Sequence, residues 1–394
     1  GVPIDVLLFE RLRLHWDQIK NKVIQKADQY YNVFEKGVFK NAKFSQYLNA
    51  HNIEWKLTPT GRPLTKAEYF EDQVVVYPEL RRLYEATQFK SKMRAEKMSI
   101  GVDGRNRGEM WAFGTKTGRN APSTNSCIFA AAKWLRMLIK PPKGQAVAYL
   151  DYSQQEIAVA AVLSKDKVMQ KGYESGDFYL AFAKEVKAIP KEGTKKTYPE
   201  VRRKYKAIAL GVHYGKGAYR LGKELGITEE EAKILLGNHK ITYFAYWDWI
   251  DRFILNAQVT GKVLTWDRWP FYTKKAKFTT LLNYPMQATA ASMFRLAVIL
   301  CYQEDIKVVA MVHDAILIEA PIESIEQEAK KAKQCMIEAS KIILEGFPLR
   351  VDETIIKYPE RYQDEEGFLQ WKENLEHLRV AEKAEMGVIK NAKI

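Results

Sequence analysis

Cysteine and long apolar runs are both scarce in this sequence of 394 residues. The three cysteines, Cys127, Cys301 and Cys335, are scattered and lack the close pairing of zinc ligands. They argue against a zinc site or a disulfide framework and fit a reducing cytoplasm. No run of 18 apolar residues occurs, which excludes a transmembrane helix. We therefore expect no membrane partner.

An initiator methionine and internal repeats are absent as well. The chain starts Gly1-Val-Pro-Ile without a signal peptide, which is typical of a fragment of a longer protein. Its length suits two or three packed units. The apolar share of 46% is typical of a globular protein and excludes a disordered one.

Positive charge is what the sequence has in excess. The net charge of +14 favours a polyanionic partner. Between Arg81 and Gln145, fourteen Lys or Arg stand against four acidic residues, an excess of ten in 65 residues. Such a stretch is often only a solvated face. Here it is interleaved with Gly, Asn, Ser and aromatics, as in residues 117–123, which suits contacts with phosphates and the minor groove.

Hydrophobic periodicity predicts the order of the elements. In the first 130 residues we expect a helix over 6–30, a turn-rich segment over 37–65 with a short helix near 44–48, a helical segment over 66–98, and loops with short strands over 101–128. Further on we expect a strand over 145–151, a helix over 153–164 and several helices over 166–257. These are followed by a hairpin over 261–273, a helix over 288–303 and a strand bearing Asp314. The last expected elements are a helix over 323–344, a strand over 348–356 and, after 361, a charged tail that is helical at best.

Two acidic residues, Asp151 and Asp314, each lie at the end of a short run with β-strand character. If the strands are neighbours, the two carboxylates can hold two Mg²⁺ ions for a phosphoryl transfer. A strand-end Asp is also common as a cap, and His313-Asp314 could form a β-turn. Ser153 and Glu156 likewise have the spacing of a helix capping box.

Residues 201–215 predict a helix, preceded at 197–200 by a second capping box with an early proline. Such a helix can grip a triphosphate with its cations and cover sugar and base with its larger side chains. An amphipathic helix with solvated cations has the same pattern. Four residues at four-residue steps share one face of this helix: Arg202, Lys206, Leu210 and Tyr214.

The order of these motifs resembles motifs A, B and C of family A DNA polymerases. Asp151–Glu156 is similar to motif A, Arg202–Gly215 to motif B and Val312–Asp314 to motif C. The resemblance covers roughly residues 1–356. It also includes Gly1–Asp5, Thr117–Arg119, Leu135-Arg136 and Asn283–Gln287.

The resemblance implies an α+β class with a right-hand polymerase fold, in which the palm sheet is antiparallel and the fingers and thumb are helical. Because the 3′–5′ exonuclease of the family lies before the thumb, we expect it to be missing. The implied segments are 1–100 thumb, 101–165 first part of the palm with a minor-groove-binding loop and motif A, 166–260 fingers, 261–360 second part of the palm with motif C, and 361–394 C-terminal tail.

The implied activity is template-directed DNA synthesis, in which deoxynucleotides are added to a primer 3′-hydroxyl by two-metal-ion transfer. Asp151 and Asp314 would be the ligands of two Mg²⁺ ions, for which Mn²⁺ can substitute. Lys206 would give a proton to pyrophosphate. The implied partners are primer–template DNA and dNTPs, and the implied form is a monomer in the cytoplasm of a bacterial or phage-infected cell.

The resemblance also implies contacts with the nucleotide and with DNA. Glu156 would exclude the ribose 2′-hydroxyl, and Tyr214 would lie beside the templating base. The implied nucleotide-binding residues are Arg202, Lys206, Leu210, Tyr214, Glu156 and Tyr179. The implied DNA-binding residues are Arg119, Arg136, Asn283, Gln287 and His313, of which Arg119, Asn283 and Gln287 would contact the minor groove.

Four positions depart from the family pattern: Leu210 replaces an aromatic residue, Ala315 a Glu, Tyr179 a His and Ala158 an Arg. None removes an essential group, so we expect an active enzyme with altered nucleotide handling. One alternative is a single-subunit RNA polymerase, against which Glu156 argues. Another is an inactive DNA-binding scaffold. The joint presence of both Asp residues with Arg202 and Lys206 argues against the scaffold.

Overall fold

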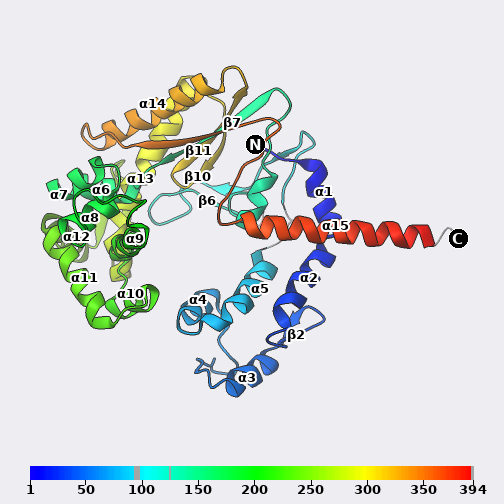
Figure 1. The fold of residues 1–394 in the computed structure, drawn as a ribbon. Helices are drawn as coiled ribbons and strands as arrows, with labels where there is room; N and C mark the ends of the chain where they lie inside the picture. Colours follow the sequence, from blue (N-terminus) through cyan, green and yellow to red (C-terminus); the bar gives the residue numbers. More distant parts are fainter. Residues whose placement is uncertain (93–97, 124–125, 392–394) are drawn as a thin grey trace. The chain divides into compact units, whose positions relative to one another are not determined.

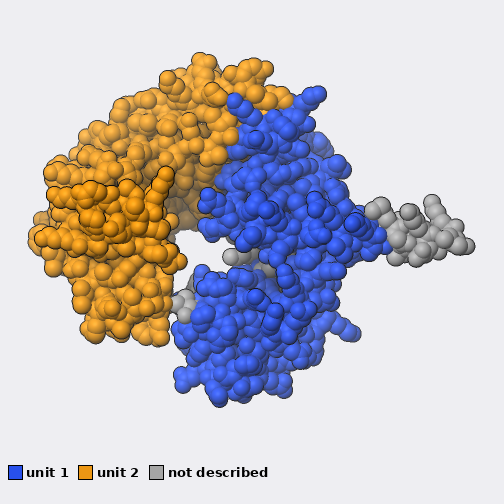
Figure 2. Space-filling model, viewed as in Figure 1, with its two compact units in different colours: residues 1–109, 122–143, 356–394 blue, residues 110–121, 144–355 orange. Residues whose placement is uncertain are grey.

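The computed structural model describes residues 1–92, 98–123 and 126–391. Two compact units are distinguished in Figure 2. Unit 1 comprises residues 1–109, 122–143 and 356–394, and unit 2 comprises residues 110–121 and 144–355. Within the described ranges, no helix is long and apolar enough to cross a membrane.

A four-stranded sheet with the order β10-β11-β7-β12 forms the centre of unit 2 (Figure 1). β11 pairs antiparallel with both β10 and β7, and Ala315 stands opposite Asp151. The predicted α+β class with an antiparallel sheet is therefore confirmed. The strands are β7 (Gln145–Tyr152), β10 (Val308–Val312), β11 (Ala315–Pro321) and β12 (Val351–Lys357).

The inner strands of this sheet are apolar and largely buried. Leu150 on β7 and Ile316 on β11 are fully buried. Helix α14 (Ile325–Ile343) packs on both strands, and α13 (Phe278–Gln303) packs against α14 and against α6 (Gln155–Leu163). This packing fixes the end of β7, and with it the position of Asp151.

The remaining helices of unit 2 follow α6 along the chain and are drawn in green in Figure 1. Aromatic rings fill their interior, where Phe182 contacts both His239 and Tyr243. The helices are α7 (Lys167–Glu174), α8 (Phe178–Glu185), α9 (Pro199–His213), α10 (Ala218–Leu225), α11 (Glu229–Thr242) and α12 (Phe244–Thr260). The predicted hairpin over 261–273 is confirmed by β8 (Lys262–Leu264) and β9 (Pro270–Tyr272).

Unit 1 is mainly helical, with a separate aromatic core around Phe44 and Phe70. Its helices are α1 (Val6–Leu14), α2 (Trp16–Asp28), α3 (Asn41–Ala50), α4 (Ala67–Val76), η1 (Pro78–Leu80), α5 (Arg81–Lys92), η3 (Lys133–Leu138) and α15 (Phe368–Asn391). Its short strands are β1 (Val2–Pro3), β2 (Phe34–Glu35), β3 (Val38–Phe39) and β4 (Arg105–Asn106), while β5 (Met110–Trp111) pairs with β6 (Ala121–Pro122).

The prediction of one helix over 6–30 is wrong, because α1 ends at Leu14 and α2 begins at Trp16. His15 and Trp16 are both buried, so the break lets two successive side chains enter the core. Packing here outweighs local helix propensity. The segment predicted as helical over 66–98 is likewise divided, and its residues 93–97 lie outside the described ranges.

Both predicted capping boxes are also wrong. Gln154, in a left-handed conformation (φ 53°), caps α6, and the Ser153 hydroxyl instead donates to Asp352. Tyr198 caps α9 without a side-chain bond, although Pro199 does start that helix. The helix predicted over 288–303 begins ten residues earlier, at Phe278, and contains Pro285.

Candidate active site

The two predicted carboxylates lie at the same end of the sheet. Asp151 is near the end of β7, and Asp314 is in the turn between β10 and β11. His313 has a left-handed backbone in that turn (φ 53°), and the Tyr152 N–H donates to the Asp314 carbonyl at 3.5 Å. The β-turn alternative for His313-Asp314 is therefore correct, and this turn lies beside Asp151.

Burial disfavours the charged form of both carboxylates. Burial raises the pKa of Asp151 to about 7, with further contributions from Asp314 and Asp352. Burial also raises the pKa of Asp314. The Asp151 Oδ1 atom is buried and has no hydrogen-bond partner among the described residues. Such a pair favours a neighbouring cation.

The donor set fits divalent ions that are shared with a substrate. No group of three or more His, Cys, Asp or Glu in the described ranges could hold a metal by itself. Mg²⁺ in proteins is commonly held by one or two carboxylates together with water and substrate phosphates. Asp151 and Asp314 suit that kind of site better than a closed site made only of protein ligands.

Glu156 is fixed beside these carboxylates by two donors. Its Oε1 atom accepts from Arg119 Nη2 at 3.1 Å and from the Tyr214 hydroxyl at 3.2 Å. These residues line a cavity of about 410 Å³, the carboxylate cavity. The predicted site residues that line it are Arg119, Asp151, Glu156, Tyr179, Leu210, Tyr214, His313 and Asp314.

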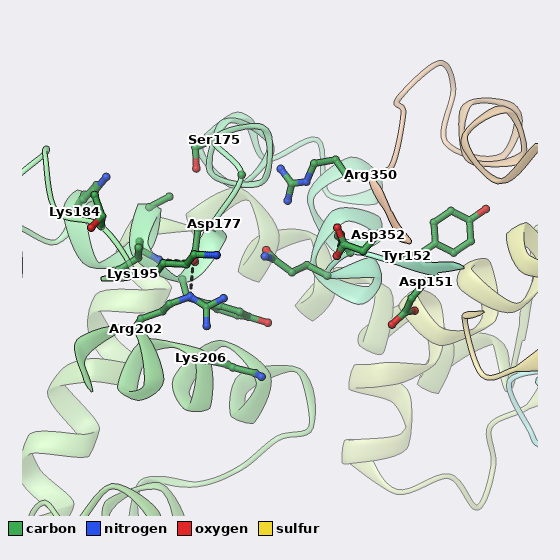
Figure 3. Close-up of a pocket in the computed structure, with 17 residues that line it drawn as sticks. Asp151, Tyr152, Ser175, Asp177, Lys184, Lys195, Arg202, Lys206, Arg350 and Asp352 are labelled. Atoms are coloured by element: carbon green, nitrogen blue, oxygen red, sulfur yellow. Dashed lines mark hydrogen bonds and ion pairs between the residues drawn. The ribbon is translucent and has the colours of Figure 1, made fainter. Parts of the chain in front are cut away.

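A second cavity, of about 800 Å³, also reaches Asp151 (Figure 3). We call it the cationic cavity. The Arg202 Nε atom donates to Asp177 Oδ2 at 2.5 Å, and its guanidinium lies 5.4 Å from the centre of the Tyr179 ring. The charged residues lining the cavity are Lys184, Lys195, Arg202, Lys206 and Arg350, with Asp151, Asp177 and Asp352.

Five of these charged residues were not predicted from the sequence: Asp177, Lys184, Lys195, Arg350 and Asp352. Asp177 could have been expected as a helix cap, because Asp is favoured at the position before a helix. Its carboxylate accepts from the Leu180 N–H of α8 at 3.2 Å. Arg350 and Asp352 had no such local signal. They reach the site only through the placement of β12 beside β7, a pairing between distant parts of the chain.

The predicted DNA-binding residues do not all lie together. Arg119 and His313 line the carboxylate cavity, whereas Asn283 and Gln287 lie on α13. Asn283 is buried, and its Oδ1 atom has no hydrogen-bond partner among the described residues. Arg136 belongs to unit 1, where it donates to Asp364 at 3.1 Å and to the Phe129 carbonyl at 2.9 Å.

The four departures from the family pattern occupy defined surroundings. Leu210 lines the carboxylate cavity. Ala315 is fully buried opposite Asp151, so no third carboxylate stands at that point of the sheet. Tyr179 is 5% exposed and supports the Arg202 guanidinium, and Ala158 is buried on α6. Tyr179 therefore contacts the Arg202 cation, whereas the His of the family pattern could itself carry a positive charge.

Three comparisons with known proteins agree. The chain is 31% identical over 235 residues to DNA polymerase I of Borreliella burgdorferi, covering 55% of this chain and 25% of that protein. It is 26% identical over 377 residues to DNA polymerase I of Aquifex aeolicus, covering 90% and 63%. The chain thus spans less than two thirds of either relative's length.

Among solved structures, the fold is similar to the POL domain of Pol1 from M. smegmatis in complex with DNA primer-template and dNTP. The TM-score is 0.72 at 22% identity, covering 90% of this chain and 67% of the other. The family model for DNA polymerase family A matches residues 10–357. Because that match spans most of the sequence, the chain belongs to DNA polymerase family A.

Proposed function

We propose that this chain carries out template-directed DNA synthesis, adding deoxynucleotides to a primer 3′-hydroxyl. The observation that carries the proposal is the convergence of Asp151 and Asp314 beside a cavity lined by cations of α9. Family membership supports it, as does the similar Pol1 structure that holds primer-template and dNTP. The proposed partners are primer–template DNA and dNTPs, and the proposed form is a cytoplasmic monomer.

Asp151 and Asp314 are the proposed ligands of two divalent ions, Mg²⁺ or Mn²⁺. When bound, such ions activate the primer hydroxyl and neutralise charge on the reacting phosphates. The two carboxylates orient this end of the site, because the sheet holds Asp151 and the β10–β11 turn holds Asp314.

Arg202 and Lys206 are the proposed ligands of the triphosphate. Asp177 takes only the Nε atom of Arg202, which leaves the two Nη atoms for phosphate oxygens. Tyr179, beneath the guanidinium, keeps it in this orientation. Lys206, one turn further along α9, is the proposed proton donor to pyrophosphate.

Glu156 is the proposed sugar-selecting residue. Arg119 and Tyr214 hold its carboxylate in place, so it cannot easily move aside for a ribose 2′-hydroxyl. Leu210 and Tyr214 border the same cavity and are proposed to contact the base and sugar. Without an aromatic ring at Leu210, stacking on the nucleotide is weaker than in the family pattern.

Arg119, Asn283, Gln287, His313 and Arg136 remain the proposed contacts to DNA. We also keep the proposed division into thumb (1–100), palm (101–165 and 261–360), fingers (166–260) and tail (361–394). The compact units group the residues differently, because residues 122–143 and 356–394 belong with residues 1–109.

A primer-extension series tests this function. The unmodified chain receives dNTPs, rNTPs or dideoxynucleotides on DNA and on RNA templates, with Mg²⁺ and then with EDTA. We expect Mg²⁺-dependent incorporation of dNTPs on the DNA template and strong discrimination against rNTPs. Preferential rNTP incorporation would support the RNA polymerase alternative, and DNA binding without any incorporation would support the scaffold.

A further inference from the structure

The cationic cavity extends beyond the two cations proposed to bind the triphosphate. In Figure 3, Asp151 and Asp352 lie at one end, Lys206 lies between, and Arg202, Lys195 and Lys184 lie toward the other end. We call Lys184 and Lys195 the outer lysines. A row of cations that begins at a candidate metal site suits an extended chain of phosphates.

The outer lysines come from two different parts of the backbone. Lys184 is half-buried on α8. Lys195 lies in a turn that Thr194 and Thr197 close reciprocally, because each backbone N–H donates to the other residue's hydroxyl, at 3.0 and 3.3 Å. The turn therefore presents Lys195 from an ordered backbone.

The charge of these lysines is not balanced by the protein. Neither outer lysine forms an ion pair with a carboxylate in the described part of the chain, whereas Arg202 is paired with Asp177. Arg350 also lines the cavity, where its Nη1 atom donates to the Tyr173 carbonyl. The cavity thus offers donors that an anionic ligand with several phosphates can use.

We propose that Lys184 and Lys195 bind the terminal phosphate of the incoming nucleotide and retain pyrophosphate after transfer. This inference rests on the proposed polymerase function. A nucleotide whose α-phosphate lies at Asp151 and Asp314 directs its later phosphates past Lys206, toward Arg202 and the outer lysines. Inorganic pyrophosphate, with the same phosphate chemistry, would occupy the same end of the cavity.

Retained pyrophosphate has a chemical consequence. In the reverse reaction, an oxygen of pyrophosphate attacks the last phosphodiester of the primer. A new P–O bond forms to pyrophosphate while the bond to the preceding 3′-oxygen breaks, which yields one dNTP and a primer shorter by one nucleotide. The 3′-oxygen takes up the proton that the attacking pyrophosphate gives up, so atoms and charge balance. The outer lysines should favour both this reaction and inhibition by pyrophosphate.

The test compares Lys184→Ala/Lys195→Ala with Lys191→Ala/Lys196→Ala. The control pair removes the same charge from exposed residues that do not line the cavity. The pyrophosphate concentration for half-inhibition of primer extension is measured for each protein. We expect about a tenfold rise for the outer-lysine variant, since two such ion contacts contribute about that much. The control should stay unchanged.

Binding of magnesium pyrophosphate to the protein without DNA provides an independent readout. It should weaken in parallel for the outer-lysine variant and stay the same for the control. If the unmodified chain extends primers and both variants bind pyrophosphate alike, the inference is wrong. If it extends no primer, yet only the outer-lysine variant loses binding, the polymerase function fails while the phosphate site stands.

Discussion

Glu156 shows how a single residue can be constrained by its neighbours. Its carboxylate accepts from both Arg119 and Tyr214, which hold it against the carboxylate cavity. Glu156→Ala is expected to raise the relative kcat/KM for rNTPs over dNTPs by about 10- to 100-fold, because the space for a 2′-hydroxyl opens. Steady-state incorporation of both nucleotides measures this ratio. The control Glu192→Ala, at an exposed position, should leave this ratio unchanged. An equal ratio in the two variants would refute the role of Glu156 in selecting the sugar.

Asp151 carries a second prediction, which concerns stability. Without divalent ions its buried carboxylate faces the charges of Asp314 and Asp352. Asp151→Asn is therefore expected to raise the free energy of unfolding by about 1–2 kcal/mol in EDTA. Mg²⁺ should raise the Tm of the unmodified protein but not that of the variant. Thermal unfolding with and without Mg²⁺ measures both effects. A variant that gains as much from Mg²⁺ as the parent would show that Asp151 is not a ligand.

At the scale of elements, α9 and α11 carry two buried histidines. Burial lowers the pKa of His213 to about 4 and that of His239 to about 3. Below pH 6.5, the approximate pKa of histidine in the unfolded chain, the unfolded chain binds protons that the folded chain does not bind. Stability is therefore expected to fall from pH 6.5 toward pH 4, by up to about 1.4 kcal/mol per pH unit for each histidine.

Urea unfolding at several pH values measures that slope, and His213→Phe separates one contribution. His213 stacks on Tyr246 at 5.4 Å, and neither ring nitrogen has a hydrogen-bond partner among the described residues, so Phe should keep the contact. The variant should show a shallower slope between pH 6.5 and pH 4. His51→Gln, at an exposed site, should keep the full slope. An unchanged slope in His213→Phe would contradict the assignment.

Helix α15 spans the break at His15 between α1 and α2. Arg11 on α1 pairs with Glu382 at 2.7 Å, and Lys26 on α2 pairs with Glu373 at 2.9 Å. Glu382→Lys is expected to lower stability by about 0.5–1 kcal/mol, because the pair is partly exposed. The combined Arg11→Glu/Glu382→Lys variant should recover it. Chemical denaturation of the unmodified chain, the two single variants and the double variant measures the coupling energy between Arg11 and Glu382. A coupling energy near zero would show that this pair does not stabilise the contact of α15 with α1.

The sequence predicts the elements that carry local patterns better than those set by distant contacts. The ends of β7 and of the β10–β11 turn, which bring Asp151 and Asp314 together, follow from short apolar runs. The break at His15 does not follow from a local pattern, because the burial of the adjacent side chains His15 and Trp16 determines it. Arg350 and Asp352 were missed for the same reason, since only the pairing of β12 with β7 brings them to the cavity.

At the scale of the whole molecule, the excess of positive charge and the candidate site point to one activity. The net charge of +14 favours a nucleic acid partner but does not identify a reaction. The proposed reaction rests on Asp151, Asp314, Arg202 and Lys206, which line two adjoining cavities in unit 2. The central claim is that Asp151 and Asp314 bind the divalent ions on which the proposed nucleotidyl transfer depends.

The most direct test is single-turnover primer extension with Mg²⁺ and dNTPs by three proteins: the unmodified chain, Asp151→Asn and the control Asp305→Asn. Asp305 is exposed, and Asn tolerates its left-handed backbone (φ 57°). We expect Asp151→Asn to lose at least about a thousandfold in rate, since removal of a preorganised charge at the reacting atoms costs about that much. DNA affinity should stay within about twofold, and the control should be normal. Incorporation by Asp151→Asn at the rate of the unmodified chain would contradict the claim.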